Sequence, residues 1–275
     1  MKLLTATALA GFALLGHAST VQAQEWQGPY LGGHVGYAFQ HEDDNETIRF
    51  DTNLDGTFGD TVNTSAQANA FSSGFCGGRA NGTTPGVGCD EDNDDVDYGL
   101  RAGYDMQFGN FVLGGLVEVS RSEIEDSVAA FSTTPARYTM TRELQAVVAA
   151  RLRAGLALSN VLVYATGGYA VGLVDRSFST SNGVNSFIET ARGDDAQGFQ
   201  YGGGAEFAIS PNWRFGAEYI RTELDDDRYR VRSGPPAPAG NPFVLVNASG
   251  TDFARSDDEF EFDSVRLTMT YRFGR

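Results

Sequence analysis

Apolar and polar residues alternate one by one along several stretches of the chain, most clearly at residues 96–108. One face carries Val96, Tyr98, Leu100, Ala102, Tyr104, Met106 and Phe108, and the other carries Asp97, Gly99, Arg101, Gly103, Asp105 and Gln107. A period of two separates the faces of a β-strand, whereas a helix would mix them. The stretch is long for a strand of a globular protein and suits a tilted membrane strand.

The same alternation predicts seven more strands, at residues 30–40, 111–122, 143–158, 161–174, 198–209, 213–222 and 264–273. At 143–158 it places Leu144 outward together with Val148 and Leu152. The register of 161–174 stays open, because Leu162 and Tyr164 compete with Val163 and Ala165 for the outer face.

The predicted connections alternate between short and long. Tight hairpin turns are expected at Gly109-Asn110, Ser159-Asn160 and residues 210–212, and long polar loops at 41–95, 123–142, 175–197 and 223–263. Short periplasmic turns and long extracellular loops are typical of outer-membrane barrels. The sequence therefore predicts an all-β fold, a single eight-stranded antiparallel up-and-down transmembrane β-barrel.

The residue types on the two faces indicate which face meets lipid. The polar face carries charges of both signs within the strands and many glycines, and a barrel of eight strands has an interior only wide enough for side chains. Aromatic residues gather at the strand ends, with Tyr30 expected in the periplasmic girdle and Tyr37 in the outer one. We therefore expect a network of interior charges formed by Arg101, Asp105, Glu118, Arg151, Arg153, Glu206, Glu218 and Arg266.

The N-terminus has the pattern of an export signal. Lys2 precedes an apolar run at 3–15, and small residues at Val21 and Ala23 suit signal peptidase. We expect a cleaved signal peptide at 1–23 and an outer-membrane barrel domain at 24–275. The net charge of −16, from 20 basic and 36 acidic residues, argues against nucleic acid as a partner. Outer-membrane lipid and lipopolysaccharide are the expected surroundings.

Several motifs resemble the small outer-membrane proteins of alphaproteobacteria, a porin-family, OmpA-like group of eight-stranded β-barrels that includes immunogenic surface antigens. The similar segments are WQGPYLGGHVGY at 26–37, RLRAG at 151–155, VYATGG at 163–168, GGGAEF at 202–207, WRFGAEY at 213–219 and TYRF at 270–273. The resemblance implies that assembly machinery reads the last strand, ending at Phe273. In this chain Gly274 and Arg275 follow that aromatic residue, and the first loop is long.

Two loop features are candidates for chemistry. Cys76 and Cys89 lie thirteen positions apart in an exported chain, which favours a loop-closing disulfide. Asp51, Asn53 and Asp55, followed by Gly56, match the first half of a Ca²⁺-binding EF-hand loop, although Val62 stands where the bidentate Glu belongs. A solvated acidic loop is the alternative.

Catalysis and cofactors are not expected. His34 and His41 are the histidines that follow the predicted signal peptide, and neither has an identifiable nucleophile or acid partner. Three function classes stay open. The favoured one is a structural, envelope-stabilising surface protein with a largely non-conducting lumen. The alternatives are a narrow porin-type channel and a module that binds a host or environmental ligand through its acidic loops.

Overall fold

The computed structural model describes residues 25–40, 45–191, 195–226 and 228–274. The predicted signal peptide at residues 1–23 and the candidate residue His41 lie outside these ranges. The described residues form β-strands and two short 3-10 helices, η1 (Pro85–Val87) and η2 (Pro242–Val244). No helix in the described residues has the length and apolar character needed to cross a membrane.

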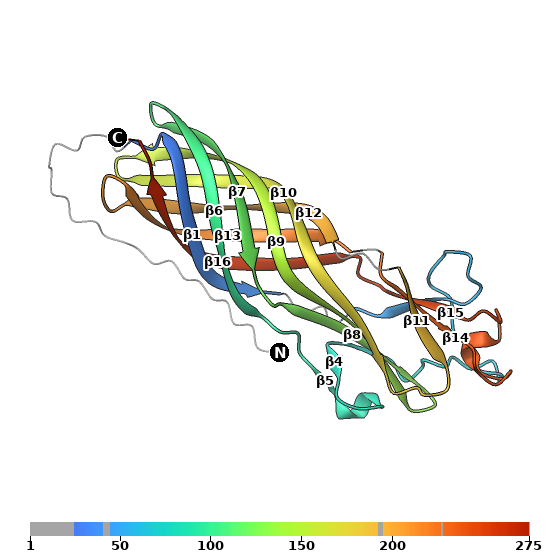
Figure 1. The fold of residues 1–275 in the computed structure, drawn as a ribbon. Helices are drawn as coiled ribbons and strands as arrows, with labels where there is room; N and C mark the ends of the chain where they lie inside the picture. Colours follow the sequence, from blue (N-terminus) through green and yellow to red (C-terminus); the bar gives the residue numbers. More distant parts are fainter. Residues whose placement is uncertain (1–24, 41–44, 192–194, 227, 275) are drawn as a thin grey trace.

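Long antiparallel strands wrap around a common axis (Figure 1). Their hydrogen-bonded order is β10-β12-β13-β16-β1-β6-β7-β9, and β9 pairs back onto β10. The strands are β1 (Gly28–Phe39), β6 (Asp95–Phe108), β7 (Phe111–Arg121), β9 (Ala136–Leu158), β10 (Val161–Thr180), β12 (Asp195–Ala208), β13 (Trp213–Asp225) and β16 (Glu259–Arg272). Period-two alternation in the sequence therefore found the strands of a β-barrel.

Tight turns join neighbouring strands at one end of the barrel. Phe108 pairs with Phe111 across a two-residue turn, and Leu158 pairs with Val161 across another. Gly109 and Ser159, the first residues of these turns, have φ angles of 63° and 60°. This left-handed backbone is what two-residue hairpin turns require, and its twist matches that of the strands they connect.

Side chains alternate between an exposed outer face and a buried interior. On β9, Leu152 is 70% exposed while its neighbours Arg151 and Arg153 are buried. On β10, Leu162 and Tyr164 are buried and Val163 is exposed, which settles the register that the sequence left open. The apolar exterior and polar interior are the arrangement of a barrel in lipid.

Two outward predictions are wrong. Leu144 is buried, because the pairing of β9 with β10 shifts register at Leu173 and Val174, and a one-residue shift turns a side chain to the opposite face. Tyr30 is buried in the barrel interior and not in the periplasmic girdle. It shares its face of β1 with His34, so the alternation itself places it inside.

The segments predicted as long polar loops largely fold into short strands, which the sequence pattern did not predict. They form a cap beyond one end of the barrel, built from the outer parts of β9 and β10 and a set of shorter strands (Figure 1). These strands are β2 (Ile48–Asp51), β3 (Phe75–Gly77), β4 (Arg79–Ala80), β5 (Cys89–Asp90), β8 (Glu125–Ser132), β11 (Ser186–Ala191), β14 (Arg230–Gly234) and β15 (Thr251–Arg255).

The cap has a hydrophobic core of its own. Strands β11, β14, β15 and β2 form one sheet, while β8 and β3 extend the main sheet beside β9. Between them pack the aromatic side chains of Phe50, Phe71, Tyr138, Phe243 and Phe253. Phe50 and Phe253 face each other as cross-strand partners, with ring centroids 5.0 Å apart. Burial of these rings supplies the hydrophobic stabilisation that a solvated loop would lack.

Candidate functional site

The barrel interior carries the candidate site, which we call the lumen charge network. Strand alternation directs its side chains inward, and the barrel's register places opposite charges side by side: Arg101 is the cross-strand partner of Glu118, and Glu218 is that of Arg266. The network comprises His34, Asp97, Arg101, Asp105, Glu118, Arg151, Arg153, Glu206, Glu218, Arg266 and Arg272, all buried.

Glu118 is the centre of the first group of ion pairs. Its carboxylate forms ion pairs with three guanidiniums. The N···O distances are 2.7 Å to Arg101, 2.9 Å to Arg151 and 2.8 Å to Arg266. Glu218 lies 2.6 Å from Arg101 and 3.5 Å from Arg151. The two carboxylates therefore share two arginines across the barrel interior.

Arg153 is the centre of the second group. It donates to Asp105 at 2.8 Å and to Glu206 at 2.6 Å. Its guanidinium also lies over the rings of Tyr30 and Tyr164, at 4.7 and 5.1 Å from their centroids. A guanidinium over an aromatic face adds cation–π attraction, which is stronger where water is excluded.

All eight network residues named from the sequence are in these two groups, and the structure adds three that were missed. Asp97 pairs with Arg266, and Arg272 pairs with Asp105. His34 lies 3.3 Å from Asp97, so the expectation that it has no acid partner is wrong. Asp97 lies on the same face of its strand as Arg101, which is the signal that could have found it.

The network is balanced in charge. Within the described residues it contains five carboxylates, Asp97, Asp105, Glu118, Glu206 and Glu218, and five guanidiniums, Arg101, Arg151, Arg153, Arg266 and Arg272. Burying a charge is costly unless an opposite charge and hydrogen bonds compensate it. This matching lets long charged side chains fill the lumen without a net buried charge.

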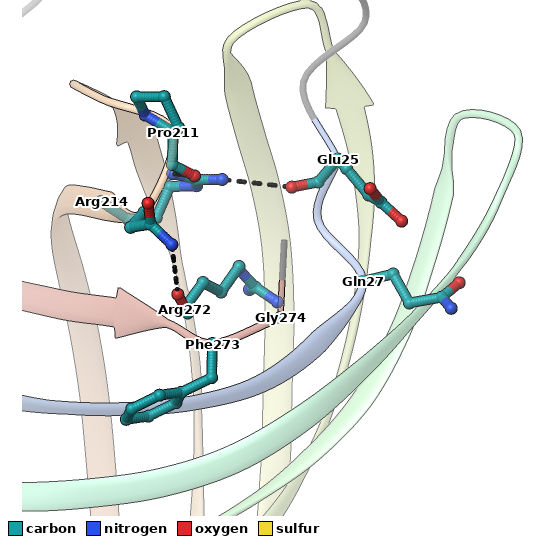
Figure 2. A pocket seen from close by; sticks show the side chains of 8 residues that line it. Glu25, Gln27, Pro211, Arg214, Arg272, Phe273 and Gly274 are labelled. Atoms are coloured by element: carbon teal, nitrogen blue, oxygen red, sulfur yellow. Dashed lines mark hydrogen bonds between the residues drawn. The ribbon is translucent and has the colours of Figure 1, made fainter.

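A tryptophan closes the end of the lumen where the short turns lie. Trp26 is buried between two guanidiniums, with Arg214 at 5.0 Å and Arg272 at 5.7 Å from its ring. Arg214 donates to the Glu25 carbonyl at 3.1 Å, and Asn212 donates to the Arg272 carbonyl at 2.9 Å (Figure 2). The segment before β1 is thereby held against the ends of β13 and β16.

An apolar layer fills the lumen on the other side of the charge network, toward the cap. Its members are buried and come from inward-facing positions: Ala38, Ile124, Leu144, Val147, Ala149, Ala170, Val174, Ala196, Leu224, Phe260 and Phe262. The rings of Phe260 and Phe262 lie 6.0 Å apart. Charged and apolar side chains thus occupy successive levels of the same narrow interior.

A family model described as outer membrane protein beta-barrel domain matches residues 126–273, more than half of the chain. The chain belongs to this family. Two relatives are the 31 kDa outer-membrane immunogenic proteins of Brucella melitensis and Brucella suis, each 28% identical over 93% of this chain and 87% of the relative. The fold is similar to that of OprG from Pseudomonas aeruginosa, with 12% identity, a TM-score of 0.50 and coverage of 93% of this chain and 100% of OprG.

This protein thus has the all-β, outer-membrane β-barrel fold and the outer-membrane location of a Gram-negative bacterium that its sequence predicted. The resemblance to small alphaproteobacterial outer-membrane proteins is confirmed by the Brucella relatives. The predicted disulfide is also present. It joins Cys76 of β3 to Cys89 of β5, with Cα atoms 6.6 Å apart.

The candidate Ca²⁺ loop folds around the carboxylate of Asp51. That carboxylate accepts hydrogen bonds from the backbone N–H groups of Leu54 at 2.7 Å and Gly56 at 2.8 Å. Asn53 and Asp55 hydrogen-bond to each other at 2.9 Å. The three candidate residues are therefore neighbours in one turn, and their oxygens already serve the backbone of that turn. In the described residues no group of three or more His, Cys, Asp or Glu side chains has the geometry to hold a metal ion.

Proposed function

We propose that the barrel is closed, with eight membrane strands, and that it is a structural, envelope-stabilising surface protein whose lumen conducts little or nothing. Support for closure comes from β10, which pairs with both β9 and β12. Closure satisfies the strand edges, which hydrocarbon demands. The observation that carries the non-conducting role is the filled lumen, in which the charge network and the apolar layer occupy successive levels.

Water and ions would need a continuous polar path through this interior. The apolar layer offers no groups to replace the hydration of an ion, and the charge network is held by mutual ion pairs. A barrel of eight strands also has an interior that side chains are just able to fill. These points favour a plugged barrel over the narrow porin-type channel.

A second candidate function is ligand binding or adhesion by the cap. The cap is a folded unit with its own aromatic core and disulfide, so it would present a fixed surface. Ile188 and Val246 of this unit are each 61% exposed. A host or environmental ligand at this surface is the partner that this alternative requires.

The remaining proposals concern surroundings and processing. The mature domain spans residues 24–275 after removal of a signal peptide at 1–23. The exposed apolar belt contacts outer-membrane lipid and lipopolysaccharide, and assembly machinery reads the last strand, which ends at Phe273. The protein is not an enzyme and uses no cofactor, and nucleic acid is not a partner.

Deletion of the gene separates the three functions. Loss of an envelope-stabilising protein should raise sensitivity to detergent and chelators and increase leakage of periplasmic enzymes, and a plasmid copy should reverse both. Loss of a porin should instead slow uptake of small solutes. Loss of an adhesin should reduce attachment while the envelope stays intact. A deletion strain with slower solute uptake and an undisturbed envelope would overturn the proposed function.

A further inference from the structure

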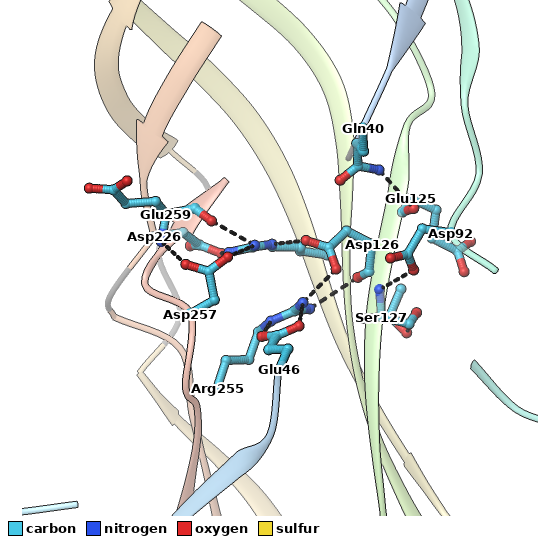
Figure 3. Close-up of polar contacts among 12 residues, drawn as sticks. Gln40, Glu46, Asp92, Glu125, Asp126, Ser127, Asp226, Arg255, Asp257 and Glu259 are labelled. Carbon is cyan, nitrogen blue, oxygen red and sulfur yellow. Dashed lines mark hydrogen bonds and ion pairs between the residues drawn. The ribbon is translucent and has the colours of Figure 1, made fainter. Parts of the chain in front are cut away.

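Figure 3 shows a second ion-pair cluster. It is buried where the barrel meets the cap, between the apolar layer and the cap core. We call it the junction cluster. Its register partners Asp126 and Arg142 stand on β8 and β9, and Arg255 reaches in from β15 of the other sheet. Four further residues belong to it. Glu46 precedes β2 and Arg176 lies near the end of β10, while Asp226 follows β13 and Asp257 follows β15.

Arg142 and Arg255 of the junction cluster form ion pairs and hydrogen bonds with groups on several elements. Arg255 donates to Glu46 at 2.7 Å and lies 2.5 Å from Asp126. Arg142 donates to Asp126 at 2.6 Å and to the Glu259 carbonyl at 2.7 Å. Burial alone would raise the pKa of Asp126, but the charges of Arg255 and Arg142 outweigh it and lower that pKa to about 2. Asp126 is therefore a permanent negative charge.

Asp92 lies beside this permanent charge and belongs to the acidic segment, residues 90–95. Its Oδ1 accepts the Ser127 N–H at 2.8 Å, and the neighbouring Asn93 exchanges two backbone hydrogen bonds with Glu125, at 3.0 and 3.1 Å. These contacts dock the segment on β8. Within the described residues no ion pair joins Asp92 to an arginine. Arg79, which lines the same crevice, pairs with Glu125.

Burial and the charge of Asp126 both disfavour a second carboxylate here. They raise the pKa of Asp92 to about 7, while the Ser127 N–H and Arg255 act in the opposite direction and Glu46 adds a smaller repulsion. The charged groups that act on Asp92 are Asp126, Arg255 and Glu46, and those that line the same crevice are Arg79, Asp90, Glu91 and Glu125. Carboxylates outnumber arginines in this set.

We propose that the acidic segment docks firmly on β8 in mildly acidic surroundings and loosens as the pH rises toward neutrality, with Asp92 as the group that switches. The geometry that supports this is the contact of the Asp92 carboxylate with β8, next to Asp126, whose carboxylate forms ion pairs with Arg142 and Arg255. Loosening would release from β8 the acidic segment, which joins the disulfide-closed loop, residues 76–89, to β6.

The direction of the pH effect follows from proton linkage. A free Asp side chain has a pKa of about 4, so the docked segment binds a proton more tightly than the undocked one. The stabilisation is complete below the lower of the two pKa values and is lost progressively as the pH rises from there through about 7. Between pH 5.5 and 8.5 the protection of the segment against hydrogen exchange should fall by roughly 30-fold.

Amide hydrogen exchange of the full-length folded protein in detergent micelles tests the proposal. Exchange rates of peptides covering residues 88–96 are divided by the intrinsic rate at each pH. The wild type should lose protection between pH 5.5 and 8.5. Asp92→Asn keeps the acceptor oxygen and removes the charge, so it should stay protected at both values. The matched control Glu91→Gln, at an exposed neighbour, should behave as the wild type.

Equal protection of the wild type at both pH values would overturn the proposal, as would a wild-type pH dependence in Asp92→Asn. A direct titration covers the case in which Asp92→Asn fails to fold. The carboxyl carbon of Asp92, followed by NMR in the wild type, should titrate near neutrality. A midpoint below about pH 5, close to that of an ordinary Asp, would also overturn it.

Discussion

Glu118 binds more arginines than any other carboxylate of the described lumen network, with Arg101, Arg151 and Arg266 around it. Attraction in a dry interior barely exceeds the cost of removing charges from water, so such a cluster is stabilising only when complete. Glu206 differs, because it forms an ion pair with one guanidinium, that of Arg153, which Asp105 also holds. The cost of losing one carboxylate should therefore depend on how many ion pairs are lost with it.

The first prediction compares Glu118→Ala with Glu206→Ala. Glu118→Ala should lower the free energy of unfolding by roughly 3–5 kcal/mol, the range for breaking a buried ion pair. Glu206→Ala should cost less, because it removes one ion pair where Glu118→Ala removes three. Urea unfolding in lipid vesicles measures both. The control is Glu123→Ala, whose ion pair with Arg121 is exposed. Equal stability of Glu118→Ala and the control would contradict the paired-network account.

The second prediction concerns glycines that make room for the network. A Cβ on Gly103 would lie 2.4 Å from the Tyr30 ring, inside the lumen, whereas one on Gly115 of the lipid face would approach Leu152 no closer than 3.5 Å. Gly103→Ala should destabilise the barrel by about 1–3 kcal/mol through overpacking. Gly115→Ala should be tolerated. A Gly103→Ala protein as stable as Gly115→Ala would show that Tyr30 can move aside.

At this scale the sequence identifies the members of the network but not their pairing. Alternation alone assigns Arg101 or Glu206 to the interior, since every second residue of a membrane strand faces inward. Pairing depends on which strands are neighbours and on their register. Arg272 was missed because it lies beside the C-terminal aromatic residue and was interpreted as part of a terminal motif.

At the scale of elements, the strands of the barrel were predicted and those of the cap were not. A membrane strand has a long, uninterrupted alternation, whereas β2, β3, β4 and β5 have four residues or fewer. The outer ends of β9 and β10 carry polar residues on both faces, for example Thr141 and Arg142 or Asp175 and Arg176. These outer ends belong to the cap, so they need no apolar face toward lipid. The alternating pattern of a membrane strand therefore ends before the strand does.

The third prediction concerns the disulfide of the cap. Replacing Cys76 and Cys89 by Ser removes a thirteen-residue cross-link, which chain-entropy models value at about 3 kcal/mol. The loss should fall on the cap, because both residues lie in its short strands. Limited proteolysis should cut residues 77–88 faster in the variant while the barrel stays resistant. Wild type treated with reductant is the matched control. Unchanged cleavage in both would contradict a stabilising role.

At the scale of the whole molecule, the barrel and its cap form a continuous structure filled along its length. The Trp26 closure, the charge network, the apolar layer, the junction cluster and the cap core follow one another from the short turns outward. Such a barrel should resist detergent until heated. The unboiled protein should migrate differently from the boiled protein on a denaturing gel, and identical migration would contradict a detergent-resistant barrel.

The central claim is that the filled lumen does not conduct, and planar-bilayer recording of the purified monomer tests it most directly. Insertion should be verified separately by protease access to the cap. The wild type should give a current no larger than that of the bilayer alone. Glu118→Ala should give brief leak events, because Arg101, Arg151 and Arg266 would then share the two carboxylates of Glu218 and Asp97, and the excess positive charge would recruit water. A stable, large single-channel conductance from the wild-type monomer would contradict the account and favour the porin-type channel.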